Sequence, residues 1–263
     1  MRTGDWWRAV LARHRWIPFV LPLAVYLIVG SLEPTSQSQP GGASIGLAIP
    51  YSAYPLVYTA KIALTLAAIA LVFPAYIQFR PRVGIVAVAV GLVGGGVWIA
   101  LCRLQLEQQL LQPLLENLRP ALEKVGLGSL LTAGQRPGFN PLEQLAHHPV
   151  WAWGFLGIRL FGLVAVVPLV EEFFYRGFLM RFVVRADWWN VPPGTVNVAA
   201  IVLAIVVPMA MHPGELIAAA VWFAAIAWLY VHTRSIWDCV AAHALTNLVL
   251  GVYVMTSGDW KLM

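Results

Sequence analysis

Long apolar segments constrain this chain more than any other feature of its sequence. A run of about twenty apolar residues is long enough to cross the hydrocarbon core of a bilayer as a helix. Hydrophobic residues make up 60% of the 263 residues and charged residues only 11%, whereas a soluble domain usually has about 25% charged residues. So little charge cannot cover a water-soluble protein with polar surface. The sequence therefore predicts an all-α, multi-span helical bundle in the lipid bilayer, with residues 1–263 as a single integral domain.

Apolar length predicts about seven spans. They are expected at residues 16–32, 53–79, 83–101, 150–184, 196–212, 215–231 and 235–257. The fourth is too long for one straight crossing, because a helix rises 1.5 Å per residue and the hydrocarbon is about 30 Å thick. It either starts on the membrane surface or breaks, and Gly157, Gly162 and Pro168 are the places where it could bend. Spans 150–257 would form the functional core.

Basic residues indicate the orientation of these spans, because cytoplasmic loops carry an excess of Lys and Arg. They precede the first span and recur in alternate loops, as Arg2, Arg8, Arg13, Arg15, Arg80, Arg82, Arg181, Arg185 and Arg234. No clear A-x-A site follows the first apolar run, which favours a retained span over a cleaved signal peptide. We expect a cell (inner) membrane protein with a cytoplasmic N-terminus and a C-terminus outside. The net charge of +5 is small, and nothing in its distribution indicates nucleic acid binding.

The 103–148 stretch differs from the rest of the chain. It is polar and nearly balanced in charge, and its leucines at helical spacing are Leu104, Leu111, Leu115, Leu118 and Leu122. This pattern predicts an amphipathic insert on the outer membrane surface, interrupted by Pro113 and Pro120. An extramembrane helical lid packed on the bundle explains the same pattern.

Three charges lie inside the apolar sequence LVEEFFYRGF, residues 169–178. A charge in mid-membrane costs about 2.5–3.5 kcal/mol on insertion scales, so it tends to pair or to face a cavity. Glu172 and Arg176 are four residues apart, which places them on one helix face in the favourable order for an ion pair. Glu171 points about 100° away from Glu172 and needs another explanation. It is either a functional carboxylate or a buried, protonated structural carboxyl.

Other spans hold polar residues that could join Glu171. His212 ends the fifth span, and His243 and Asn247 lie four residues apart on one face of the seventh. At 1.5 Å per residue, these side chains and Glu171 reach compatible depths in the membrane. A single histidine at a span end is often only an interfacial residue, and an HxxxN pair can simply bind one helix to another. The sequence does not show that these helices are neighbours.

These residues, in this order, resemble the CPBP family of intramembrane proteases, which includes CAAX proteases and bacteriocin-processing enzymes and is also called the Abi family. That family has EExxxR, FxxxH and HxxxN or HxxxD on successive spans. Here the motifs end in Arg176, His212 and Asn247, and the resemblance covers about residues 160–250. The family's Phe in FxxxH is Pro208 in this chain. The insert, the length and the sequence SGDWKLM look like the CAAX-protease-related subgroup that accompanies exosortase sorting systems in Gram-negative bacteria.

The resemblance implies an intramembrane endopeptidase of the glutamate type that needs no cofactor. Glu171 would be the base that activates water and His212 would hold that water. His243 and Asn247 would form the oxyanion hole. Glu172 and Arg176 would orient the site. The substrate would be a membrane-associated protein or peptide, and a protein-sorting system is a possible partner.

Two other functions fit the same residues. Glu171, His212 and His243 could be the three protein ligands of a catalytic zinc. Intramembrane carboxylates and histidines also build ion paths, so a non-enzymatic transporter or sorting-accessory protein is a further alternative. Lys61 and Arg159 would suit a transporter, but pairing with Asp238 or Glu215 is the expected structural explanation for them.

Overall fold

The computed structural model describes residues 3–34, 49–124 and 138–263, and the elements in those ranges are helices. The helices are α1 (Thr3–Arg13), α2 (Ile17–Gly30), α3 (Tyr54–Val72), α4 (Ile85–Arg103), α5 (Gln112–Asn117), α6 (Arg119–Lys124), α7 (Pro141–Gln144), α8 (Pro149–Phe161), α9 (Val167–Glu172), α10 (Met180–Val184), α11 (Val198–Ala210), α12 (Leu216–Thr233) and α13 (Ile236–Ser257). This confirms the all-α fold. Arg2 and residues 35–48 and 125–137 of the predicted outer loop and insert lie outside the described residues.

The apolar helices agree with the prediction of about seven spans. Five helical stretches are long and apolar enough to cross a membrane, at Tyr51–Ala75, Ile85–Arg103, Pro149–Val184, Pro213–Thr233 and Ile236–Ser257. Two shorter apolar helices, Ile17–Gly30 and Val198–Ala210, correspond to the remaining predicted spans. The chain is therefore a multi-pass membrane protein.

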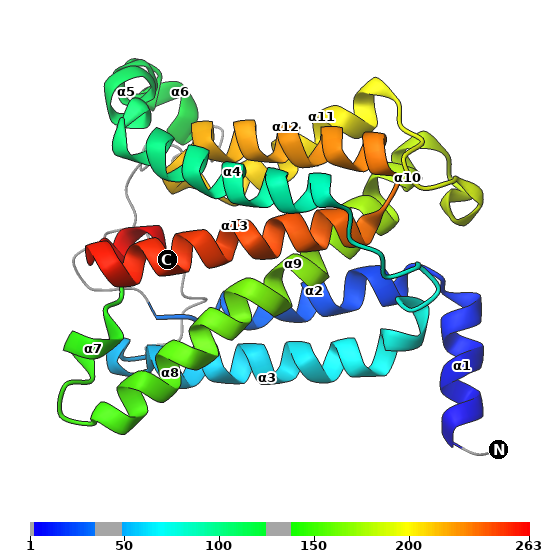
Figure 1. The fold of residues 1–263 in the computed structure, drawn as a ribbon, viewed down its shortest axis with the longest axis horizontal. Coiled ribbons are helices and arrows are strands. Elements are labelled where there is room, and N and C mark those ends of the chain that lie inside the picture. The colour runs from blue at the N-terminus through cyan, green and yellow to red at the C-terminus, as the bar shows by residue number, and fades with distance from the viewer. Residues whose placement is uncertain (1–2, 35–48, 125–137) are drawn as a thin grey trace.

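The fourth predicted span is one continuous helix from Pro149 to Val184, which we call the long helix. Its 36 residues would extend about 54 Å as an α-helix, so it must tilt or project beyond the hydrocarbon. Figure 1 shows it running diagonally across the other helices. It does not break as one alternative expected. Instead it widens into a first π segment, Gly162–Val166, and a second π segment, Phe173–Leu179.

The first π segment explains how Pro168 is accommodated. In a regular α-helix the proline ring would clash with the carbonyl four residues earlier and leave that carbonyl without a donor. A π turn just before the proline changes this register, so the helix continues. The second π segment begins directly after Glu172 and contains Arg176. The two glutamates therefore sit on a short α-helical piece, α9, between two irregular ones.

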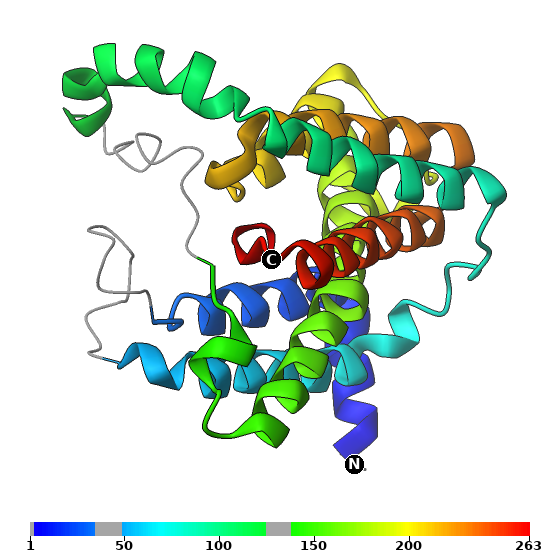
Figure 2. The ribbon, with the colours of Figure 1, turned by 60° about the vertical axis from the view of Figure 1, so that its left-hand side comes forward.

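The long helix passes between two groups of helices. Helices α2 and α3 lie on one side of it, and α4, α11, α12 and α13 lie on the other (Figure 2). Helix α13 packs very closely on α4 through two glycines four residues apart. A Cβ added at Gly91 would come within 2.7 Å of the Ala242 carbonyl oxygen, and one at Gly95 within 2.7 Å of Val249 Cβ. This glycine seam lets the two backbones approach and fixes the position of α13.

Side-chain caps begin the two helices that position the predicted histidines. Asn197 Oδ1 accepts a hydrogen bond from Ala200 N at the start of α11, at 2.8 Å. Ser235 Oγ accepts from Asp238 N at the start of α13, at 3.1 Å. Such caps satisfy backbone donors that a helix start leaves free, so each helix begins at a defined residue.

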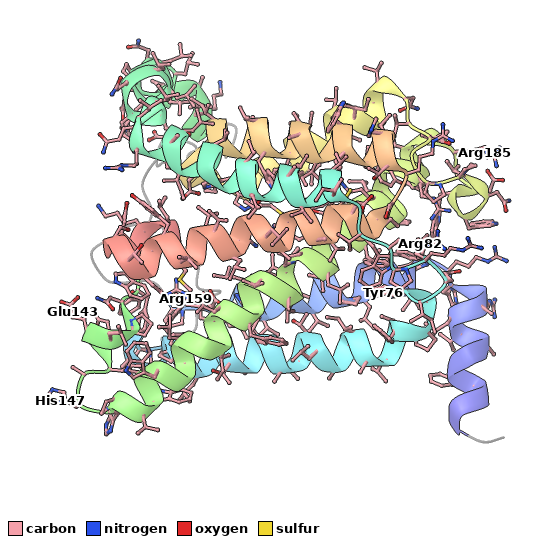
Figure 3. The ribbon with its side chains drawn as sticks, in the orientation of Figure 1. Tyr76, Arg82, Glu143, His147, Arg159 and Arg185 are labelled. Carbon is pink, nitrogen blue, oxygen red and sulfur yellow. The ribbon has the colours of Figure 1, made fainter. Side chains whose placement is uncertain are left out.

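Charged side chains occur at both ends of the bundle. Arg82 and Arg185 lie at one end, and Glu143 and His147 lie at the other (Figure 3). Arg80 and Arg234 line the same surface depression as Arg82. Because Arg103 lies at the opposite end of α4 from Arg82, the orientation in the membrane stays a prediction.

The expected pairing of Lys61 and Arg159 with Asp238 or Glu215 is wrong. Lys61 forms an ion pair with Glu33, and Arg159 donates hydrogen bonds to main-chain oxygens of Phe139 and Met263. Asp238 instead accepts a hydrogen bond from Gly84 N at 2.8 Å. Sequence spacing could not reveal these partners, because each one comes from a distant segment.

Candidate active site

Four predicted site residues from three different helical regions line one cavity. Its volume is about 360 Å³, and its walls include Glu171, His212, His243 and Asn247. Glu171 comes from α9, His212 follows the end of α11, and the other two lie on α13. The sequence had predicted compatible depths without showing that these helices are neighbours. The structure brings all four together.

Glu172 lies at the centre of a fully buried polar cluster beside this cavity. Its Oε2 is 3.0 Å from a guanidinium nitrogen of Arg176, as the i, i+4 spacing predicted. Its Oε1 is 2.9 Å from His243 Nδ1. Neither Glu172 nor Arg176 has any exposed side-chain surface. The carboxylate of Glu172 is therefore used on both oxygens, and it connects the long helix to α13.

Glu171 is also buried, with 6% exposure, but its environment differs. It lines the cavity, whereas Glu172 does not. Within the described part of the chain, Glu171 Oε2 and Glu172 Oε2 both lack a hydrogen bond, but Glu172 Oε2 has the ion pair with Arg176. A buried carboxylate oxygen without a partner is costly, so Glu171 Oε2 is a candidate functional group. This agrees with the separation of roles that the helical spacing suggested.

His212 is oriented by the helix that precedes it. Its Nδ1 lies 2.8 Å from the carbonyl oxygen of Pro208, to which it can only donate. The neutral imidazole then has an unprotonated Nε2, which accepts a hydrogen bond. The ring packs edge-on against Trp98 at 5.8 Å and tilted against Phe223 at 5.6 Å. Pro208, the departure from the family's FxxxH, is buried in the last turn of α11 and supplies this carbonyl.

Asn247 is tied to the first π segment. Its Nδ2 donates a 2.7 Å hydrogen bond to the carbonyl oxygen of Leu163. That carbonyl needs an outside donor because Val167 N bonds to Gly162 O, and the next candidate, Pro168, has no N–H. Nδ2 has a second hydrogen that remains for another acceptor. Asn247 thus holds the irregular helix beside α13 and lies one turn from His243.

An aromatic block closes the bundle on the far side of the buried cluster. It consists of Phe19, Tyr76, Phe79, Phe173 and Trp237. Phe173, which follows Glu172, stacks on Tyr76 at 3.9 Å between ring centroids. None of these five residues lines the cavity. Glu172 therefore lies between tightly packed rings and the cavity that contains Glu171.

Residues 151–249 match the family model of the type II CAAX prenyl endopeptidases, Rce1-like. The family resemblance is confirmed. The matched segment contains all six residues that the sequence had singled out, from Glu171 to Asn247. No curated protein and no solved structure matches the chain. The match supports a membrane-embedded protease of the CAAX type.

The zinc alternative depends on how closely the three proposed ligands approach one another. Glu171, His212 and His243 line the same cavity. Within residues 3–34, 49–124 and 138–263, however, no three His, Cys, Asp or Glu side chains are grouped closely enough to hold a metal ion. A zinc site at these residues would therefore require side-chain movement.

Several residues around the candidate site were not predicted. Trp98 and Trp222 line the cavity and pack against His212 and His243, respectively. The glycine seam of α4 has the small-xxx-small spacing typical of close membrane helices, so Gly91 and Gly95 could have been found from the sequence. Leu262 and Met263 also line the cavity, and no pattern in the sequence indicated this.

Proposed function

We propose that this protein is an intramembrane endopeptidase that hydrolyses a peptide bond with water activated by Glu171. The observation that supports this most directly is the difference in surroundings between the adjacent residues Glu171 and Glu172, which lie in the segment that matches the protease family model. Glu172 is paired on both oxygens, while Glu171 faces a cavity shared with two histidines and an asparagine. A base, an orienting group and hydrogen-bond donors are the parts that peptide hydrolysis needs.

In the proposed reaction, Glu171 accepts a proton from water as the oxygen attacks the carbonyl carbon of the scissile bond. The carbonyl π electrons move to oxygen and form a tetrahedral oxyanion. Collapse of this intermediate breaks the C–N bond, and Glu171 returns the proton to the leaving nitrogen. His212 accepts a hydrogen bond from the same water through Nε2, because Nδ1 is engaged by Pro208.

His243 and Asn247 are the proposed donors to the oxyanion. Asn247 has its second Nδ2 hydrogen for this purpose. His243 donates through Nδ1 to Glu172, so it must be doubly protonated for Nε2 to donate as well. The contact with Glu172 fixes the orientation of the imidazole ring. Glu172 and Arg176 are therefore positioning residues, which act through His243 rather than on the substrate.

The proposed substrate is a membrane-associated protein or peptide. The glutamate mechanism, a bacterial inner-membrane location with the N-terminus in the cytoplasm, and a link to an exosortase-type sorting system are parts of the same proposal. The apolar helices around the cavity support a substrate that approaches within or along the bilayer. Signal, bacteriocin or sorting-tag peptides are the candidate classes, by analogy with the family rather than from the site.

The test is reconstitution in liposomes with tagged membrane peptides of these three classes, in water enriched in ¹⁸O. Wild type is expected to generate new peptide ends that carry one ¹⁸O atom, detected by mass spectrometry. Glu171→Gln is expected to generate none, because the amide cannot accept the proton. Full cleavage by Glu171→Gln would refute the assigned base.

A chelator arm separates the zinc alternative from the proposed mechanism. Full activity after incubation with a strong chelator, with metal content checked by mass spectrometry, is expected for the glutamate mechanism. Loss of activity that added zinc restores would instead support Glu171, His212 and His243 as ligands.

A further inference from the structure

The segment after α13 folds back onto the helix it follows. Gly258 has a left-handed backbone, with φ of 74°, and its N–H bonds to Val254 O at 2.9 Å. This arrangement ends a helix and reverses the chain, and it favours glycine. Residues 260–262 then form a short 3-10 turn. The reversal carries residues 259–263, which we call the return segment, toward the cavity.

The return segment forms part of the cavity wall with its own side chains. Leu262 and Met263 are lining residues beside Glu171, His243 and Asn247. Met263 is 6% exposed and packs with Leu156 of the long helix and Val254 of α13. Lys261, which precedes them in the turn, is exposed. The segment is therefore only partly buried: Met263 packs against the helices, and Lys261 remains exposed.

The main chain of the return segment is held as closely as its side chains. A Cβ added at Gly138 would come within 2.8 Å of the Trp260 carbonyl carbon, so the two backbones touch. Arg159 donates one hydrogen bond to Phe139 O, at 2.8 Å, and another to Met263 O. Arg159 is only 4% exposed. A buried guanidinium that binds main-chain oxygens recognises a peptide regardless of its side chains.

We propose that the return segment occupies a peptide-binding subsite of the cavity, and that Arg159 anchors the main chain of whichever peptide lies there. This proposal rests on the proposed function, because it assumes that a peptide substrate binds in the cavity. The substrate would take the place of the return segment once that segment is displaced. The return segment then competes with the substrate and lowers activity until it is displaced. Arg159 binds and positions; it is not a catalytic residue.

The distance along the long helix sets the register of this subsite. Arg159 precedes Glu171 by twelve residues, which is about 18 Å of helix. An extended peptide covers about 3.3 Å per residue. A peptide anchored at Arg159 therefore reaches Glu171 about five residues from the anchored carbonyl, and cleavage is expected there.

The binding part of the proposal is tested without any cleavage. Full-length protein with Met263→Cys is treated with N-ethylmaleimide in detergent, and mass spectrometry localises the label apart from Cys102 and Cys239. Adding the synthetic peptide GDWKLM, which copies residues 258–263, is expected to accelerate labelling of the introduced, buried thiol several-fold and saturably. Lys261→Cys is the matched control, because the side chain at this position is exposed already and its labelling rate should hardly change.

Two further arms keep the test decisive. Arg159→Gln is expected to raise labelling without peptide and to weaken the effect of the peptide. A GDWKLM peptide with a photoreactive leucine analogue is expected to cross-link to the wild-type chain near Leu156 and Leu163. An unchanged labelling rate, an equal effect of a scrambled peptide, or cross-links elsewhere would overturn the subsite.

The inhibitory part uses the reconstituted cleavage assay. Leu262→Ser/Met263→Ser is expected to lower KM several-fold with little change in kcat, whereas Lys261→Ser should leave both unchanged. A drop in kcat that follows a loss of thermal stability would mean that the return segment is only structural. Labelling and cross-linking need no turnover, so they test the subsite separately from the chemistry. If they succeed while Glu171→Gln still cleaves, the subsite stands and only the proposed role of Glu171 fails.

Discussion

The two sides of α9 differ in whether their polar side chains are paired with one another. On one side Glu172 binds both Arg176 and His243, and the next residue, Phe173, belongs to the aromatic block. On the other side Glu171 lies at a cavity with His212 and Asn247. Both sides are buried and both carry a carboxylate, so burial alone does not separate them. The difference in partners supports the proposal that Glu172 stabilises the fold and that Glu171 acts in the reaction.

The comparison is sharpest when the two glutamates are changed in the same way. Glu171→Gln should reduce cleavage by about 10²–10⁴-fold, the contribution typical of a general base, with little change in thermal unfolding. Glu172→Gln should reduce both cleavage and stability, because it unpairs Arg176 and His243. Cleavage rates and unfolding in detergent are measured on both variants. Equal stability loss in the two would erase the distinction between the sides.

The buried ion pair gives the next largest effect. Arg176→Met should cost about 3–5 kcal/mol of unfolding free energy, because it breaks the buried ion pair and leaves Glu172 Oε2 without a partner. The double variant Glu172→Gln/Arg176→Met should regain much of that stability but not the activity. A double-mutant cycle by reversible SDS titration measures the coupling. Additive losses would show that the pair does not act as a unit.

The glycine seam tests whether both sides depend on the position of α13. Gly95→Val should cost about 1–3 kcal/mol and reduce cleavage, because the new side chain meets Val249, pushes α13 away from α4 and so displaces it relative to the long helix. Gly96→Val is the matched control, since a Cβ there meets nothing within 4 Å. Unfolding and cleavage are compared in the pair. Similar losses of stability and cleavage at both positions would mean that valine weakens the helix itself, and that the contact with Val249 is not the cause.

The smallest expected effect lies on the cavity side. Asn247→Ala removes the hydrogen bond to the Leu163 carbonyl, which is expected to cost about 1 kcal/mol of stability. Cleavage should fall further than that, because the second N–H is lost as well. Comparing kcat with thermal stability separates these contributions. Normal kcat in a slightly destabilised Asn247→Ala would leave Asn247 with a structural role only.

Much of this architecture could be predicted because its causes are local. Apolar length identified the spans, and the i, i+4 rule identified the Glu172–Arg176 pair before any neighbour was known. The same rule isolated Glu171. The family resemblance, since matched over residues 151–249, directed attention to His212, His243 and Asn247.

The remaining features depend on contacts between distant segments. Spacing could not show that His243 binds Glu172, that Arg159 binds two main-chain oxygens, or that Lys61 pairs with Glu33. Pro168 marked a place for a bend, but whether a helix kinks or widens there depends on outside donors such as Asn247. The return segment has no periodic pattern at all, so only the fold reveals where it lies.

The π segments of the long helix have a consequence for how this chain tolerates insertions and deletions. A π turn holds one residue more than an α turn, so each segment contains a local surplus of one residue. Removing one residue from the part of the second π segment that follows Arg176 would be absorbed by a return to α geometry, leaving the helix on either side in place. The first π segment has no such freedom, because α geometry there would bring Pro168 against the carbonyl four residues earlier. Removing one residue from the regular α9 would rotate Glu171 out of the cavity. The spare residue therefore confines length variation in this helix to the turn that follows the two glutamates.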